Sequence, residues 1–153
     1  MTGKIEAIYI AQSRRDTVKQ VGSAILEAGR GIVGDRYHAN SKKLIDAGSV
    51  VPDNHVTLIA QEELDIFLGS HENDICYGDF RRNLITSGID LNTLVGKEFS
   101  VGDAICRGIE LCEPCATLAR LVHPAVLPNL VHKAGLRAVI VKDGEIEVGG
   151  EIT

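Results

Sequence analysis

Apolar and polar residues alternate over several short stretches of the chain, a pattern typical of β-strands. Lys4–Ile10 becomes apolar on both sides near its end, which indicates a buried strand. His55–Ile59 is rich in β-branched residues, and Phe80–Thr86 ends at Ser87-Gly88, so each predicts a strand. Glu98–Val101 and Ala104–Leu111 are predicted strands joined by a turn at Gly102-Asp103. The chain therefore begins as a series of short strands.

The last part of the chain carries the strongest hairpin pattern. Leu136–Lys142 and Glu145–Val148 flank Asp143-Gly144, a dipeptide favoured in two-residue hairpin turns, and predict two paired strands. Val21–Ala28 is compatible with a strand or a short helix, because its periodicity favours neither.

Helices are expected at few places. In Ala60–Leu68 the residues Leu64, Phe67 and Leu68 follow helical spacing, and Gly69 is a plausible C-cap. Pro124–Ala134 predicts a second helix, ending at Gly135. Gly31–His38 is expected to be an ordered loop, and Ser41–Asn54 a loop around no more than a short helical turn.

These elements predict a mostly β fold. Many short strands, few short helices and 16 glycines in 153 residues favour one domain whose twisted antiparallel sheet forms a closed or partly open β-barrel, or a sandwich. A chain of this length buries enough surface to fold without disulfides or metal.

Composition and charge restrict the classes of partner and the cellular compartment that we expect for this protein. The formal net charge of -5 lacks the basic excess expected of a nucleic-acid-binding protein. Residues 1–12 do not resemble a secretory signal, and no run of 18 apolar residues exists, so neither export nor a membrane span is expected. We therefore expect a cytoplasmic protein in a reducing environment, where cysteines more often serve chemistry or metal binding than disulfides.

The segment Cys112-Glu113-Pro114-Cys115 allows three interpretations. A thioredoxin-like redox pair requires a βαβ setting, whereas this motif follows a predicted β-hairpin. A structural zinc site requires further ligands, for which Cys106, His123 and His132 are candidates at no standard spacing. Two half-buried structural cysteines are the third interpretation. Cys115 is favoured for chemistry, because 116–122 can begin a short helix whose N-terminus would stabilise a thiolate.

Three arginine clusters are candidate anion sites. Arg36 follows Asp35, which can fix the guanidinium or cap a turn. Arg81 and Arg82 are adjacent on a predicted strand, so at most one would face a given pocket, and Asn83 would point with Arg81. Arg137 begins a strand. Each has an ordinary alternative, a solvated arginine in a turn or at a strand end, and His55 and His71 are expected to be structural.

Together and in this order, the motifs resemble a MOSC domain, the domain at the C-terminus of molybdenum cofactor sulfurases, a pyridoxal-phosphate-associated family. The matching segments are GDRYH at 34–38, VTLI and the following helix at 56–68, the block at 78–104, CEPC at 112–115, and GLRAVIVKDGEIEVGGEI at 135–152. The block at 78–104 is the most specific of them. Gly149-Gly150-Glu151 departs from the Gly-Asp that members often carry.

The resemblance implies a barrel-like fold and a cysteine, by position Cys115, that carries sulfur or ligates molybdenum. In MOSC proteins that reduce N-hydroxylated compounds, the equivalent thiolate binds molybdenum held by a pterin. In sulfurase-type members the domain carries or receives sulfur. The chain lacks the N-terminal β-barrel domain of larger reductases and shows no flavin, haem or iron–sulfur motif, so redox turnover would need an external electron donor.

The leading hypothesis is a small MOSC protein that binds molybdenum cofactor (molybdopterin), carries a persulfide on Cys115, or does both. The expected catalytic residues are Cys115, also the metal ligand, and Cys112 as a resolving thiol. The expected cofactor-binding residues are Asp35, Arg36, His38, Arg82, Asn83 and Arg137. A cysteine desulfurase-type sulfur donor or an electron-donor protein would be the partner. The alternatives are a molybdenum-dependent reductase of N-hydroxylated small molecules, and a non-catalytic module that binds an anion or a partner.

Overall fold

A computed structural model describes residues 2–14, 16–69, 75–113 and 130–153. Within them, seven strands close into a β-barrel in the order β11-β7-β8-β9-β5-β6-β1, with β1 pairing back to β11. These strands are β1 (Gly3–Ile10), β5 (Val56–Ala60), β6 (Leu84–Ser87), β7 (Glu98–Val101), β8 (Ala104–Leu111), β9 (Leu136–Lys142) and β11 (Glu151–Ile152). The expected mostly β barrel is therefore confirmed, and it is closed.

One pairing in the barrel departs from the expected antiparallel pattern. Strands β5 and β6 run parallel, whereas the other named pairings are antiparallel. A parallel pair needs a long crossover, and here the crossover contains the helix α2 (Gln61–Gly69). Leu64 and Phe67 of α2 are buried, and the Phe67 ring meets Phe80 edge-on with centroids 5.9 Å apart. The prediction of a helix over 60–68 is confirmed.

A second, smaller sheet lies beside the barrel and contains β10 (Gly144–Glu147), β3 (Ser23–Glu27) and β4 (Gly31–Ile32). The short strand β2 (Lys19–Val21) pairs antiparallel with β1. The prediction that 136–142 and 145–148 pair as a hairpin is wrong. β9 pairs with β5 and β8, and β10 pairs with β3. The turn at Asp143-Gly144 instead passes the chain from one sheet to the other, and the Asp143 carboxylate accepts a 2.6 Å hydrogen bond from the Ala28 amide.

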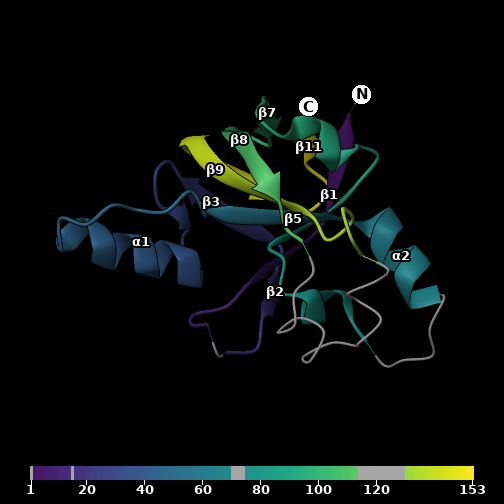
Figure 1. Ribbon diagram of the computed structural model, residues 1–153, viewed down its shortest axis with the longest axis horizontal. Helices are drawn as coiled ribbons and strands as arrows, with labels where there is room; N and C mark the ends of the chain where they lie inside the picture. The colour runs from purple at the N-terminus through teal and green to yellow at the C-terminus, as the bar shows by residue number, and fades with distance from the viewer. Residues whose placement is uncertain (1, 15, 70–74, 114–129) are drawn as a thin grey trace.

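The prediction of loops over 31–38 and 41–54 is also wrong in part. Gly31–Ile32 forms β4, and Arg36–Asp46 forms the helix α1, which lies on the opposite side of the barrel from α2 (Figure 1). Asp35 caps this helix, since its carboxylate accepts from the Tyr37 amide. The helix has few apolar residues, and that is why hydrophobic periodicity did not indicate it.

The strand predicted over 80–86 begins only at Leu84. Tyr77–Phe80 is a 3-10 turn, and Arg81 has a φ of 59°, in the left-handed region that strands do not use. Another 3-10 turn spans Leu91–Leu94. The undecided segment 21–28 contains β3, a strand. The helix predicted over 124–134 falls largely outside the described residues, and its described end, 130–134, is a turn.

The barrel interior is a continuous apolar core. Ile5, Ile8, Leu58, Leu84 and Val101 are among its fully buried members. A smaller cluster beneath α2 includes Leu64, Phe67, Phe80 and Leu130. No helix in the described part of the chain is both long and apolar enough to span a bilayer.

Candidate functional site: a basic cleft beside Cys112

An open cleft with a volume of about 740 Å³ lies where α1, the entry to β6 and the start of β9 come together. It is lined by Gln12, Ser13, Arg14, Arg36, Tyr37, Ala39, Asn40, Lys43, Asn54, Phe80, Arg81, Arg82 and Arg137, which we call the basic cleft. Six of these side chains are cationic, and none of the described lining residues is acidic. A protein with a net charge of -5 thus gathers positive charge in one concave place.

Helix α1 supplies one wall of the basic cleft. Arg36, Asn40 and Lys43 are spaced at i, i+4 and i+7 and therefore share a helix face. The Asp35 cap fixes where this helix begins, and Asp35 Oδ1 also accepts from the Ala11 amide at 3.0 Å. Asp35 fixes Arg36 as expected, but it caps a helix where a turn was expected.

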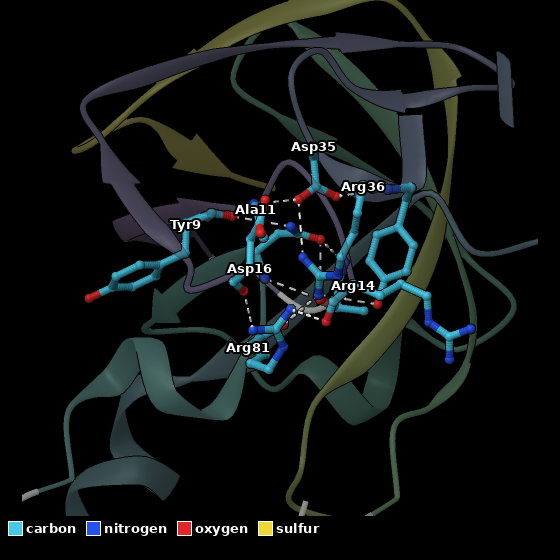
Figure 2. A network of polar contacts seen from close by, with 10 residues as sticks. Tyr9, Ala11, Arg14, Asp16, Asp35, Arg36 and Arg81 are labelled. Atoms are coloured by element: carbon cyan, nitrogen blue, oxygen red, sulfur yellow. Dashed lines mark hydrogen bonds and ion pairs between the residues drawn. The ribbon is translucent and has the colours of Figure 1, made fainter. Parts of the chain in front are cut away.

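Arg36 is a structural link within this wall. It is only 8% exposed, and its Nη1 pairs with Asp35 Oδ1 at 3.1 Å. Its Nη2 donates to the Arg81 carbonyl at 3.0 Å, and its guanidinium lies over the Tyr37 ring, 4.5 Å from the centroid. Figure 2 shows this network of Asp35, Arg36 and Arg81. The ordinary alternative of a solvated Arg36 is therefore wrong.

Arg81 connects the network to the segment after β1. Its two terminal nitrogens donate to the carbonyls of Asp16 at 2.7 Å and Arg14 at 2.9 Å (Figure 2). Burial and then the neighbouring Arg36 lower the pKa of Arg81. Arg81 thus holds the backbone that carries Arg14 at the edge of the cleft.

Arg82 lines the same cleft as Arg81, so the expectation that at most one of them faces a given pocket is wrong. That expectation assumed a strand, whereas the left-handed backbone at Arg81 abolishes the alternation. Arg82 Nε donates to the Ala134 carbonyl at 2.9 Å. Asn83 is fully buried and bonds to the Thr57 amide and the Tyr9 carbonyl, so it joins three strands and does not line the cleft.

Arg137 and Asn54 contribute the two unsatisfied polar atoms of the site. Arg137 Nη1 donates to Glu110 Oε1 at 2.6 Å, but its buried Nε has no hydrogen-bond partner. The buried Asn54 Oδ1 also has none. Within the described residues these are the only two buried side-chain polar atoms left unpaired, and both residues line the basic cleft.

Cys112 lies next to this region. It is 4% exposed, and its amide donates to the Gly135 carbonyl at 2.8 Å. Burial raises the pKa of the Cys112 thiol, and the positive charges of Arg82 and Arg137 oppose that shift. Cys112 is therefore a protonated thiol close to two cleft arginines, while Cys115 lies outside the described residues.

His38, which was expected near an anion, points elsewhere. His38 Nε2 lies 2.7 Å from Glu27 Oε1, which ties α1 to β3, and His38 does not line the cleft. His55 is structural as expected, since its Nδ1 accepts from the Ile140 amide at 3.0 Å, whereas His71 lies outside the described residues.

The candidates for a zinc site do not converge in the described structure. Cys106 is fully buried in the barrel core, where burial raises its pKa to about 12, while His132 is exposed and pairs with Glu113. Among residues the structure describes, no group of three histidine, cysteine or acidic side chains is placed to hold a metal ion. His123 lies outside them.

Sequence reasoning missed Arg14, Lys43 and Asn54. Lys43 would have been found by extending the helical spacing from Arg36, had the segment been recognised as a capped helix. Nothing in the local sequence distinguishes Arg14 or Asn54, because only the closure of the barrel places them in one cleft.

Comparisons with known proteins agree with this architecture. The family model described as "MOSC domain" matches residues 38–153. The YuaD protein of Bacillus subtilis has a similar structure, with 20% identity, a TM-score of 0.81, and coverage of 99% of this chain and 94% of that one. YiiM of Geobacillus stearothermophilus is 15% identical with a TM-score of 0.70, covering 99% and 74%. YiiM of Escherichia coli is 18% identical with a TM-score of 0.68, covering 99% and 68%. No curated protein sequence matches.

Proposed function

We propose that this chain, which belongs to the MOSC domain family, binds the molybdenum cofactor in its basic cleft and uses Cys115 as a sulfur carrier or molybdenum ligand. The observation that carries the proposal is the cleft itself, in which six cationic side chains meet beside the first cysteine of CEPC without an acidic lining residue among those described. A reducing cytoplasm, which keeps thiols free, is the compartment that the proposal requires.

The composition of the cleft fits a phosphate-bearing pterin. No described residue forms an ion pair with Arg14 or Lys43, so both charges are available to an anion. Arg82 keeps one terminal nitrogen outside its two bonds to the carbonyls of Ala134 and Phe80. Arginine donors and lysine charges are the groups that proteins use for phosphate. Asp35, Arg36 and Asn83 would keep these donors in position.

The sulfur chemistry is assigned to Cys115 because Cys112 is unsuitable for it. A buried, protonated thiol is a poor nucleophile, whereas sulfur carriage needs a thiolate. Cys115 is three residues further along, and three residues span at most roughly 11 Å of chain. The proposal requires that the guanidinium groups that act on Cys112 also act on Cys115 and favour its thiolate.

Loading of Cys115 needs no external oxidant. Its thiolate attacks the outer sulfur of a donor persulfide of the cysteine desulfurase type. A new sulfur–sulfur bond forms on Cys115 as the donor's bond breaks, and the donor leaves as a thiolate. In the resolving role, Cys112 would first have to lose its proton; its thiolate would then attack the inner sulfur of the persulfide, form a disulfide with Cys115 and release sulfide. A bound cofactor would supply redox chemistry at molybdenum, for which an electron-donor protein would be the partner.

The test combines metal analysis and intact mass. Wild-type protein made in a host that synthesises the cofactor should retain molybdenum and a pterin, and Cys115→Ala should lose the metal or its labile sulfur. A persulfide donor should add one sulfur to Cys112→Ala. Wild type should carry the added sulfur or, after resolution by Cys112, the Cys112–Cys115 disulfide, and Cys115→Ala should show neither. If the protein retains neither molybdenum nor pterin and gains no sulfur, the proposal is wrong, and the alternative of a non-catalytic module that binds an anion remains.

Turnover of an N-hydroxylated substrate distinguishes the reductase alternative from the sulfur carrier. It predicts that molybdenum-loaded protein, given an artificial electron donor, reduces an N-hydroxylated substrate and that Cys115→Ala abolishes this activity. A sulfur carrier without such activity predicts sulfur addition in the absence of metal.

A further inference from the structure

The basic cleft has two chemically different parts. Arg14 and Lys43 are cations with no acidic partner among the described residues, whereas Arg137 is already paired with Glu110 at 2.6 Å. Because Glu110 balances its charge, Arg137 is less suited to an anion and better suited to donate from Nε to a neutral oxygen. The same cleft also offers an unpaired acceptor, Asn54 Oδ1.

A phosphate does not satisfy both atoms. A phosphate oxygen accepts a hydrogen bond from Arg137 Nε, but a deprotonated phosphate has no hydrogen to offer Asn54 Oδ1. Buried polar groups in folded proteins are nearly always paired, and a ligand that carries an N–H and a carbonyl would pair both of these atoms. A lactam, in which a ring N–H stands next to a ring C=O, has both.

We infer that Arg137 and Asn54 bind the lactam edge of a planar heterocycle, of the kind found in pterins and in guanine, while Arg14 and Lys43 bind its anionic end. This inference rests on the proposed function and adds to it a specificity residue, Asn54, and a division of the cleft. Arg137 Nε donates to the ring carbonyl, and Asn54 Oδ1 accepts from the ring N–H.

The sequence neighbourhood supports a rigid placement for this pair. Thr57 on β5 is directly opposite Arg137 on β9, and the His55 amide, next to Asn54, donates to the Ala138 carbonyl at 3.2 Å. Arg137 is therefore held within β9, and Asn54 lies in the loop two residues before β5, next to the His55 contact. Donors and acceptors that are held in place before binding lose little freedom on binding.

The experiment measures binding of pterin itself, which has the lactam edge and no phosphate, by quenching of its fluorescence. We expect saturable binding to wild type and at least about tenfold weaker binding to Asn54→Leu. Asn54→Asp keeps an acceptor oxygen and should retain binding of pterin. Gln20→Leu, an amide-to-apolar change on the exposed part of β2, is the matched control and should bind like wild type.

A second arm uses the unaltered protein and so does not depend on how a variant folds. 3-Methylpterin has lost the ring N–H, and we expect it to bind at least about tenfold more weakly than pterin. Guanosine separates the two sources of the lactam: competition at similar concentration assigns the site to the shared edge, and competition by pterin alone assigns it to the pterin ring. Either result supports the inference.

Two results would overturn it: no pterin binding by wild type, or equal affinity of pterin and 3-methylpterin together with wild-type affinity in Asn54→Leu. The outcome is distinguishable from failure of the proposed function. The proposed function is tested by molybdenum retention and sulfur addition, and neither is measured with free pterin. If the cofactor is held by its phosphate alone, the proposed function stands although this inference fails.

Discussion

Two clefts of similar size in the described part of the structure differ in how their polar groups are paired. The second, of about 650 Å³, includes Glu62, Glu63, Asp90, Asn92, His132 and Lys133, and we call it the acidic cleft. Its carboxylates have partners within the protein. Glu62 accepts from the Gly88 amide at 2.8 Å, Asp90 from the Asn92 amide at 3.1 Å, and Glu63 lies 4.0 Å from Lys133.

The basic cleft contrasts with this arrangement. Among the residues that the structure describes, Arg14 and Lys43 have no acidic partner there, and two buried polar atoms have no hydrogen bond. A polar cavity that satisfies itself is explained by the stability of the fold. Unpaired buried polar groups cost free energy, which the proposed ligand would offset. The difference between the clefts therefore lies in pairing, not in volume.

The largest expected effect comes from reversing the free charges. The double variant R14E/K43E should hold the cofactor at least about a hundredfold more weakly, because two attractions for the phosphate become repulsions. Molybdenum and pterin content of purified protein measures this, with thermal unfolding as a check on folding. The matched variant E62K/E63K in the acidic cleft should retain wild-type content, and equal loss in both variants would abolish the distinction.

The next largest effect is expected at Asn83, a buried amide that holds the strands behind the basic cleft together. Asn83→Ala should lower the free energy of unfolding by about 2–3 kcal/mol, because it unpairs the Thr57 amide and the Tyr9 carbonyl in the interior. Urea denaturation measures the change. Asn92→Ala, an amide at the acidic cleft whose bond to the His132 carbonyl is exposed, should cost less than about 1 kcal/mol.

A smaller loss is expected at the start of α1. Asp35→Ala removes the N-cap of α1, the bond to the Ala11 amide and the partner of Arg36, and should cost about 2 kcal/mol. Asp35→Asn keeps an oxygen for the cap and should recover part of the loss. If both variants unfold at the urea concentration of wild type, Asp35 does not organise the wall of the cleft.

The smallest effect depends on pH. Burial lowers the pKa of His55 below its ordinary 6.5, and the neutral ring accepts a hydrogen bond from the buried Ile140 amide. The unfolded state then binds more protons than the folded state between the lowered pKa and 6.5, so the free energy of unfolding is constant above about pH 6.5 and falls as the pH drops through that window. His55→Asn should remove this fall, measured by urea denaturation at several pH values. The exposed His132→Asn should not, and an unchanged profile in His55→Asn would contradict the assignment.

Much of the barrel could be predicted from local pattern. The strand over 98–101, the turn at Gly102-Asp103 and the strand over 104–111 were predicted with their observed bounds, because they are neighbours in sequence and pair with each other. The helix over 60–68 was also predicted, since its apolar spacing faces a core. Each of these depends on interactions between nearby residues.

The errors concern partners that are distant in the chain. The dipeptide Asp143-Gly144 correctly indicates a turn, but a hairpin does not follow, because the Gly144 backbone packs so closely on the turn before β8 that a Cβ there would lie 2.3 Å from the Ala104 nitrogen. The strand pairing with β10 is then β3, more than a hundred residues earlier. Arg81 and Arg82 share a cleft only because one backbone angle is left-handed.

The sequence alone determined the family motifs, the β character and the residue types with anion chemistry, because these depend on composition and short-range order. The tertiary structure decided which charged and polar side chains lie together in the basic cleft. Arg14, Lys43, Asn54 and Arg137 come from four separate segments, and closing the barrel brings them to one cleft while it directs His38 to Glu27. The physical reason is that electrostatic and hydrogen-bond complementarity depends on distances of a few ångströms, which the order of residues along a chain does not specify.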